Sequence, residues 1–126
     1  MRTSMLLPGV LLAAAATAAA QTPSSREPER LTWTEVRELV PARINTVILP
    51  TGTLEAHGVA PNGTDIMAPL AMAREIAGRV NALVAPVVPY GFTGSLDAYA
   101  GGLTVPEDAY RPYVRAVLMG LAKNKF

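Results

Sequence analysis

The stretch Thr46-Val47-Ile48-Leu49-Pro50-Thr51-Gly52-Thr53-Leu54-Glu55-Ala56-His57-Gly58 decides the fold of this chain. Its first four residues are β-branched or apolar, which is typical of a buried strand, and Pro50 and Gly52 end that strand. Glu55 and His57 follow two residues apart, so their side chains point the same way on an extended backbone. A carboxylate and an imidazole therefore stand at the carboxyl end of a strand, where open α/β sheets bind their ligands.

Asp65 adds a third candidate ligand, because the turn-forming residues before it can fold the chain back to the same place. Carboxylate and imidazole ligands suit zinc, manganese or iron, held as one ion or as two adjacent ions. Asp65 also stands just ahead of a helical pattern, and Asp is a favoured residue at a helix N-cap. A carboxylate has several lone pairs, so the sequence leaves both roles open.

Helical patterns flank this stretch on both sides. Thr32 and Glu35 have the spacing of a capping box, which predicts a short helix from about residue 33 to 40 that Pro41 ends. A stripe of apolar residues predicts a second, longer helix over residues 66–80.

The C-terminal part of the chain continues with a strand, a loop and a helix. A buried strand is predicted over residues 82–88, where Pro86 indicates a bulge or an edge. The long loop over residues 89–103 favours either substrate binding or a surface loop with aromatic side chains beneath it. After Pro106 a final helix is predicted, with a core-facing stripe at Tyr110, Val114, Val117, Leu118 and Leu121.

The N-terminus has the features of a secretory signal peptide over residues 1–20. Arg2 precedes an apolar run, and Ala18-Ala19-Ala20 forms a small-residue cleavage site. The run is shorter than the roughly 20 residues that span a bilayer, and Pro8 interrupts it, which argues against a stable membrane anchor. We therefore expect a periplasmic or secreted protein with a solvated linker over residues 21–30.

Composition narrows the class of protein further. The chain has 126 residues, no cysteine and a formal net charge of +1. One domain over residues 31–126 is expected, held by its core without disulfides. The scattered, nearly balanced charges give no electrostatic footprint for nucleic acid, so a small molecule is the expected partner.

Several motifs in this order resemble those of the creatininase (creatinine amidohydrolase) family. The segment from Leu49 to Gly58 resembles the family signature LPxGxxExHG. Leu31-Thr32-Trp33 precedes it as in the family, and Pro89-Tyr90-Gly91-Phe92 looks like the loop after the family's second strand. The segment Tyr99-Ala100-Gly101-Gly102-Leu103-Thr104-Val105 is similar to the family's FPGTLTL loop.

The resemblance implies a three-layer α/β/α fold and a metal-dependent amidohydrolase that cleaves a cyclic or linear amide C–N bond. In such an enzyme Glu55 would bind a first metal ion, His57 a second, and Asp65 would bridge the two. The loop that carries Thr93, Ser95 and Asp97 would lie near a small-molecule amide substrate, and the family tends toward homo-oligomers.

The family pattern continues beyond the final helix into a strand and an Asn-Gly-His-Gly-Gly-Asn motif, whereas this sequence stops at Phe126. On this basis we expect the N-terminal part of a creatininase-like domain, in which the hydrolase is incomplete. The alternative is an exported fragment or small binding domain without catalysis.

Overall fold

The computed structural model describes residues 22–126, so the predicted signal peptide lies outside the described residues. Along the chain the elements are η1 (Pro28–Arg30), α1 (Trp33–Leu39), β1 (Thr46–Ile48), α2 (Thr64–Ala77), β2 (Ala82–Val84), η2 (Gly94–Ala98) and α3 (Glu107–Lys123). Within residues 22–126, no helix is both long and apolar enough to cross a membrane.

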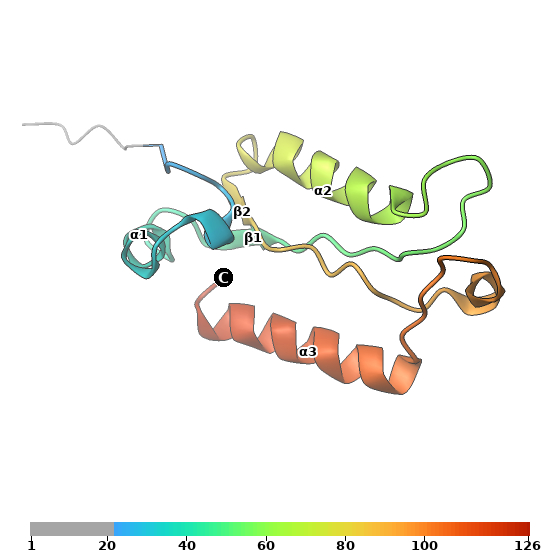
Figure 1. Ribbon diagram of the computed structural model, residues 1–126. Coiled ribbons are helices and arrows are strands. Elements are labelled where there is room, and N and C mark those ends of the chain that lie inside the picture. Colours follow the sequence, from blue (N-terminus) through green and yellow to red (C-terminus); the bar gives the residue numbers. More distant parts are fainter. Residues whose placement is uncertain (1–21) are drawn as a thin grey trace, which may run out of the picture.

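The two strands are parallel neighbours, joined by α2 as the crossover helix. Thr46 pairs with Ala82 and Ile48 with Val84. Beyond the named strands the pairing continues to a bridge between Thr51 and Val88. Figure 1 shows α2 along one face of the strands and α3 on the other side, running back in the opposite direction to β1. The α/β fold with three layers is therefore confirmed.

The core lies around β2, which is buried along its whole length, whereas β1 is exposed or half-buried. Two clusters of apolar side chains fix the layers. On the α2 side Val84 packs with Ala73 and Ala77, against Ile48 and Leu70. The other cluster joins α1 and the C-terminus to the strands through Leu39, Val40, Ile44 and Leu83, with Leu31, Val36, Val47 and Phe126 packed against it.

The helix boundaries and the strand lengths differ in detail from the prediction. The helix predicted over 66–80 begins two residues earlier, at Thr64, with Gly63 as its N-cap. Asp65 is thus the second residue of α2 and is not its cap. The second strand is shorter than predicted. Pairing resumes at the Thr51–Val88 bridge with one extra residue on this strand, as expected for the bulge that Pro86 indicated.

The apolar stripe predicted for α3 is the least exposed side of the helix, but it is not fully buried. Tyr110, Val114, Val117 and Leu121 are half-buried, whereas Leu118 on the same stripe is 51% exposed. The physical reason is width: two strands about 4.8 Å apart form a narrower layer than a helix about 10 Å across. The described part of the sheet therefore leaves much of the apolar side of α3 uncovered.

The segment expected to be a solvated linker is attached to the domain over part of its length. The backbone carbonyl of Arg26 accepts a hydrogen bond from the Val84 N–H at 2.8 Å, and its guanidinium donates to the Ala82 carbonyl at 2.9 Å. Glu27 forms ion pairs with Arg30 and Arg74. Together these contacts cover the edge of β2 that faces away from β1.

The predicted capping box at the start of α1 is present. The Thr32 hydroxyl accepts a hydrogen bond from the Glu35 N–H at 3.3 Å, and the Glu35 carboxylate accepts one from the Thr32 N–H at 2.8 Å. The Thr32 N–H bond is the main reason that the pKa of Glu35 is lowered; hydrogen bonds from the hydroxyls of Thr32 and Ser24 add to it.

Acid should therefore weaken the N-terminal end of α1. A carboxyl whose pKa is depressed by folding stabilises the folded state above its unfolded pKa of 4.5, and this stabilisation is lost as the pH falls through the lower folded value. Thermal unfolding of the parent chain and of Glu35→Gln at a series of pH values measures this effect. Between pH 6 and pH 3, we expect Glu35→Gln to lose less stability than the parent chain. Glu38→Gln, on the same helix but outside the cap, should behave like the parent. Equal acid sensitivity of the two variants would contradict this role of Glu35.

Candidate metal centre

A tight turn after His57 brings the predicted ligands together. The Ala60 N–H donates to the His57 carbonyl at 3.0 Å, and Gly58 within this turn has φ +59°, a left-handed conformation that glycine adopts without steric cost. The chain then returns beside itself, and the Glu55 N–H donates to the Asn62 carbonyl at 3.1 Å. As a result, the first turn of α2 begins next to the extended segment that carries Glu55 and His57.

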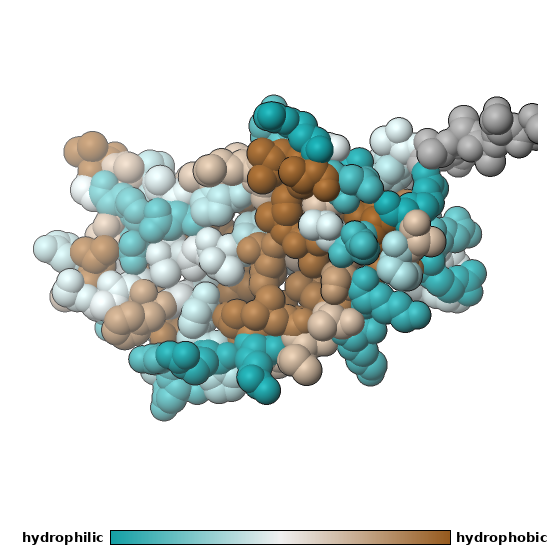
Figure 2. Space-filling view, turned by 180° about the vertical axis from the view of Figure 1, so that it is seen from behind, coloured by the Kyte–Doolittle hydropathy of each residue, from teal (hydrophilic) through white to brown (hydrophobic). Residues whose placement is uncertain are grey.

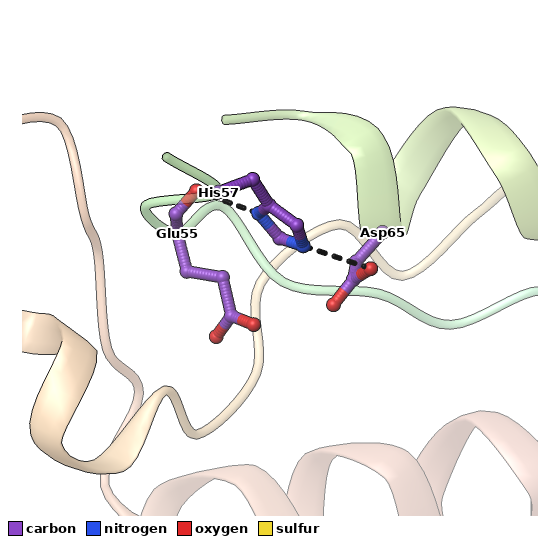
Figure 3. Close-up of side chains that lie close together, drawn as sticks. All are labelled: Glu55, His57 and Asp65. Carbon is purple, nitrogen blue, oxygen red and sulfur yellow. Dashed lines mark hydrogen bonds and ion pairs between the residues drawn. The ribbon is translucent and has the colours of Figure 1, made fainter. Parts of the chain in front are cut away.

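The His57 ring is held from both of its nitrogens. Nδ1 lies 3.1 Å from the backbone carbonyl oxygen of Glu55, and Nε2 lies 3.1 Å from Oδ1 of Asp65. Figure 3 shows the ring between the two carboxyl groups, with the Glu55 side chain on the same side of its backbone as the imidazole. The His57 side chain is 23% exposed and that of Asp65 48%, so a small ion can reach the cluster.

The donor and acceptor pattern of this cluster suits a cation. A backbone carbonyl only accepts hydrogen bonds, so Nδ1 must carry the proton that it donates to Glu55. In the neutral ring Nε2 then presents a lone pair to the Asp65 carboxylate, which is also an acceptor. Two acceptors can face each other at this distance only with a proton or a metal ion between them. The arrangement therefore fits either a protonated ring paired with Asp65 or a metal ion ligated by Nε2 and by Asp65.

The same contacts act on the protonation of the ring. The Glu55 carbonyl is the main reason that the pKa of His57 is raised, and partial desolvation opposes it. The Asp65 carboxylate raises the pKa further through its hydrogen bond and its charge, and the Glu55 carboxylate adds a smaller effect. Asp65 itself lies in the first turn of α2, where the partial positive charge of a helix N-terminus favours an anionic side chain.

The spacing of the ligand atoms is close to what one ion requires. One atom from each of Glu55, His57 and Asp65 lies within 4.8 Å of the others. Ligands held about 2.0–2.2 Å from one zinc ion are at most about 4.4 Å apart, so small side-chain rotations suffice. Two ions about 3.5–4 Å apart also fit within this spread.

Gly52, expected from the sequence only to end a strand, is also a residue of the site. A Cβ atom at this position would collide with the carbonyl group of Asp65, lying 2.7 Å from its carbon, and would lie 2.9 Å from Cα of Ile66. The lack of a side chain thus lets the first turn of α2 approach the strand. The sequence shows only a glycine beside a turn. It does not show that the backbone of Asp65 and Ile66 approaches this glycine.

The loop predicted to lie near substrate runs beside the same segment. The Leu103 N–H donates to the Leu54 carbonyl at 2.9 Å, and the Asn62 amide donates to the Ala100 carbonyl at 3.3 Å. These two bonds fix the loop next to Leu54, which precedes Glu55, and next to Asn62, whose carbonyl accepts from the Glu55 N–H.

The three predicted substrate residues differ in their surroundings. Thr93 is 7% exposed, its N–H donates to the Thr104 hydroxyl oxygen at 3.1 Å, and its own Oγ1 is buried without a partner. Ser95 and Asp97 lie in η2 and are exposed. Within residues 22–126, none of the three forms a hydrogen bond or ion pair with the candidate ligands, so their role stays a prediction.

Comparison with protein-family models finds a match over most of the chain. Residues 29–126 match the creatininase family model, described as creatinine amidohydrolase. Among curated proteins, creatinine amidohydrolase of Pseudomonas putida is 39% identical over 64 residues, which are 49% of this chain and 24% of that protein.

Solved creatininase structures have the same fold. A crystal structure of creatinine amidohydrolase superposes with a TM-score of 0.75 at 28% identity, over 81% of this chain and 42% of that one. A creatininase mutant of the Zn-Zn type and a form named creatininase Mn each give a TM-score of 0.73 at 28% identity, over 79% of this chain. The chain thus spans about two fifths of the length of these structures, 41% in both metal forms.

Proposed function

This chain belongs to the creatininase family, and we propose that Glu55, His57 and Asp65 form a divalent metal site of an amide hydrolase. The observation that carries the proposal is the contact between His57 Nε2 and Asp65 Oδ1 at 3.1 Å, with the ring already committed through Nδ1 to the Glu55 carbonyl. A hydrogen bond from the other ring nitrogen to a carbonyl, as His57 Nδ1 makes to Glu55, commonly fixes the tautomer and orientation of a metal-binding histidine.

Zinc and manganese are the metals we propose first, because solved relatives carry these metals in their names and the ligand set suits both. Among the described residues, three ligands are enough for one ion with an open position, as in catalytic zinc sites. Two ions that share the same three ligands would each be left with few protein contacts. We therefore propose one tightly bound ion per chain.

Bound there, a divalent ion supplies Lewis acidity toward the carbonyl oxygen of an amide and acidifies water near neutral pH. The residues of this chain hold the ion, orient its ligands and balance its charge. The Glu55 carbonyl keeps the His57 lone pair on Nε2, and the carboxylates of Glu55 and Asp65 offset the positive charge. The open side of the cluster would then accept a small amide with a cyclic or linear C–N bond, bordered by the loop that carries Thr93.

Metal uptake and amide hydrolysis test the proposal together. After equilibrium dialysis against Zn²⁺ or Mn²⁺, we expect elemental analysis to find about one ion per parent chain, and His57→Ala to retain less than about a tenth of it. Glu75→Gln, on the exposed side of α2, is the matched control and should bind metal like the parent. The parent chain, His57→Ala and Glu75→Gln are then assayed for ring opening of creatinine as the probe reaction.

Each result decides something different. Uptake that survives in His57→Ala would place the metal elsewhere and overturn the site. Uptake that depends on His57, with no amide hydrolysis by the loaded parent, would keep the metal site and contradict the hydrolase. Metal-dependent hydrolysis lost only in His57→Ala is the result we expect.

A further inference from the structure

Asn62 joins two segments that border the candidate metal centre. Its backbone carbonyl accepts a hydrogen bond from the Glu55 N–H at 3.1 Å, and its side-chain amide donates to the Ala100 carbonyl at 3.3 Å. Gly101 makes room for this side chain, because a Cβ at that position would lie 2.5 Å from the amide nitrogen of Asn62. The backbone of Asn62 therefore holds the segment that carries the candidate ligands, and its side chain holds the loop after η2.

Gly63 follows Asn62 and brings an accessible backbone nitrogen next to the Asn62 side chain. The two residues form the centre of a turn, in which the Thr64 N–H donates to the Pro61 carbonyl at 3.0 Å. Glycine has no side chain that would shield its nitrogen from the Cγ atom of the preceding asparagine. Gly63 also lies ahead of the hydrogen-bond ladder of α2, and its N–H donates to no acceptor within residues 22–126. This nitrogen is therefore free to react.

Water, the other reactant that the chemistry needs, has access to this end of the molecule. Pro61 is exposed, and Asn62 and Gly63 are half-buried. Figure 1 shows the turn before α2 at the end of the molecule away from the grey N-terminal trace. In Figure 2 the same end is a mixed surface with small, separate apolar spots, whereas the continuous apolar band crosses the middle of that face.

We propose that Asn62 is a site of spontaneous covalent modification, at which the side-chain amide is converted to a carboxylate. The backbone nitrogen of Gly63 bonds to Cγ of Asn62, and the bond between Cγ and the side-chain nitrogen breaks. The proton of the Gly63 N–H leaves with that nitrogen as ammonia, so a five-membered succinimide ring remains. Water then opens the ring at either of its two carbonyls, which gives aspartate or isoaspartate at this position.

The other asparagines of the chain are less suited to this reaction. None of them precedes a glycine: the three pairs are Asn45-Thr46, Asn81-Ala82 and Asn124-Lys125. The amides of Asn81 and Asn124 also donate to backbone carbonyls at 2.9 Å and 2.8 Å, which are shorter distances than the 3.3 Å at Asn62. These three residues therefore serve as internal controls in the same chain.

Conversion would change both contacts of Asn62. A carboxylate has no N–H, so the hydrogen bond to the Ala100 carbonyl is lost in either product. In isoaspartate the backbone runs through the side-chain carbon, which lengthens the link to α2 by one methylene group. The carbonyl that accepts from the Glu55 N–H then becomes part of a free carboxylate. Asp65 on α2 should therefore move relative to Glu55 and His57, a consequence for metal binding that rests on the proposed function.

Peptide mass spectrometry of the full purified chain, after incubation in neutral buffer, tests the proposal. Aspartate and isoaspartate should accumulate at Asn62 at least about tenfold faster than at the other three asparagines. Gly63→Ala is the matched variant, because Gly63 has φ −89° and the nearest atom to an added Cβ is Met67 Cε at 4.0 Å. It should keep the circular dichroism spectrum of the parent and slow the conversion of Asn62 at least about tenfold.

Metal content is a separate readout on the same incubated samples. Ion exchange separates the converted chain by its added negative charge, and the isoaspartate form should take up less Zn²⁺ than the unconverted chain. The mass measurement does not depend on metal, so a parent chain that binds no metal would contradict the proposed function and still show the conversion of Asn62. An Asn62 that reacts no faster than the other asparagines, or equally fast in Gly63→Ala, would overturn the modification site.

Discussion

Gly52→Ala is expected to destabilise the chain by about 2–3 kcal/mol and to abolish metal uptake. The added Cβ would meet the carbonyl carbon of Asp65 at 2.7 Å and Cα of Ile66 at 2.9 Å. Both are backbone atoms, which cannot rotate away as the end of a side chain can. The first turn of α2 must therefore move away from the strand, and it takes the Asp65 carboxylate with it. Chemical denaturation and elemental analysis after dialysis measure the two effects.

Gly120→Ala provides the matched control for this substitution. It introduces the same methyl group in α3, where a Cβ would have no heavy atom within 4 Å. Because alanine favours helix over glycine, this variant should be more stable by about 0.5–1 kcal/mol and should keep its metal. A Gly52→Ala variant that is as stable as the parent and binds metal normally would contradict the close approach of α2 to the strand at this position.

Asp65→Asn should separate metal binding from folding. The asparagine side chain can direct an N–H toward Nε2 of His57, which accepts it, so the contact at this position is kept in the folded protein. The free energy of unfolding of the metal-free chain should change by less than about 0.5 kcal/mol. An amide oxygen is a much weaker ligand than a carboxylate, and the affinity for Zn²⁺ should fall at least about a hundredfold.

This result also distinguishes the two roles that the sequence left open for Asp65. If the Asp65 carboxylate served only to stabilise α2, Asp65→Asn would destabilise the metal-free protein and would have no specific effect on its zinc affinity. A competition titration against a chelator of known affinity, with unfolding measured on the same samples, makes that comparison. Unchanged zinc affinity in Asp65→Asn would remove Asp65 from the site.

Local signals in the sequence predicted the elements that depend on local contacts. The capping box at Thr32 and Glu35 forms as predicted, because both partners lie within one helical turn. The start of α2 was less certain from sequence, since Gly63, Thr64 and Asp65 are all residues that favour helix N-caps. The structure selects Gly63 and thereby directs the Asp65 carboxylate to His57.

Contacts between distant parts of the chain were not predictable in this way. The apolar pattern of α3 correctly indicated which side of the helix avoids water, but a pattern cannot show what covers that side. The same holds for Gly52, whose neighbours Asp65 and Ile66 are brought to it only by the turn after His57. For the three candidate ligands, strand alternation predicted that Glu55 and His57 point the same way, and the return of the chain adds Asp65.

Zinc-edge anomalous diffraction from crystals of the zinc-loaded chain tests the central claim most directly. We predict one strong peak per chain between Nε2 of His57 and the Asp65 carboxylate, with the Glu55 carboxylate as the third protein ligand, at about 2.0–2.2 Å from each ligand atom. A crystal with no anomalous peak beside His57, or with zinc bound only at other residues, would contradict the account.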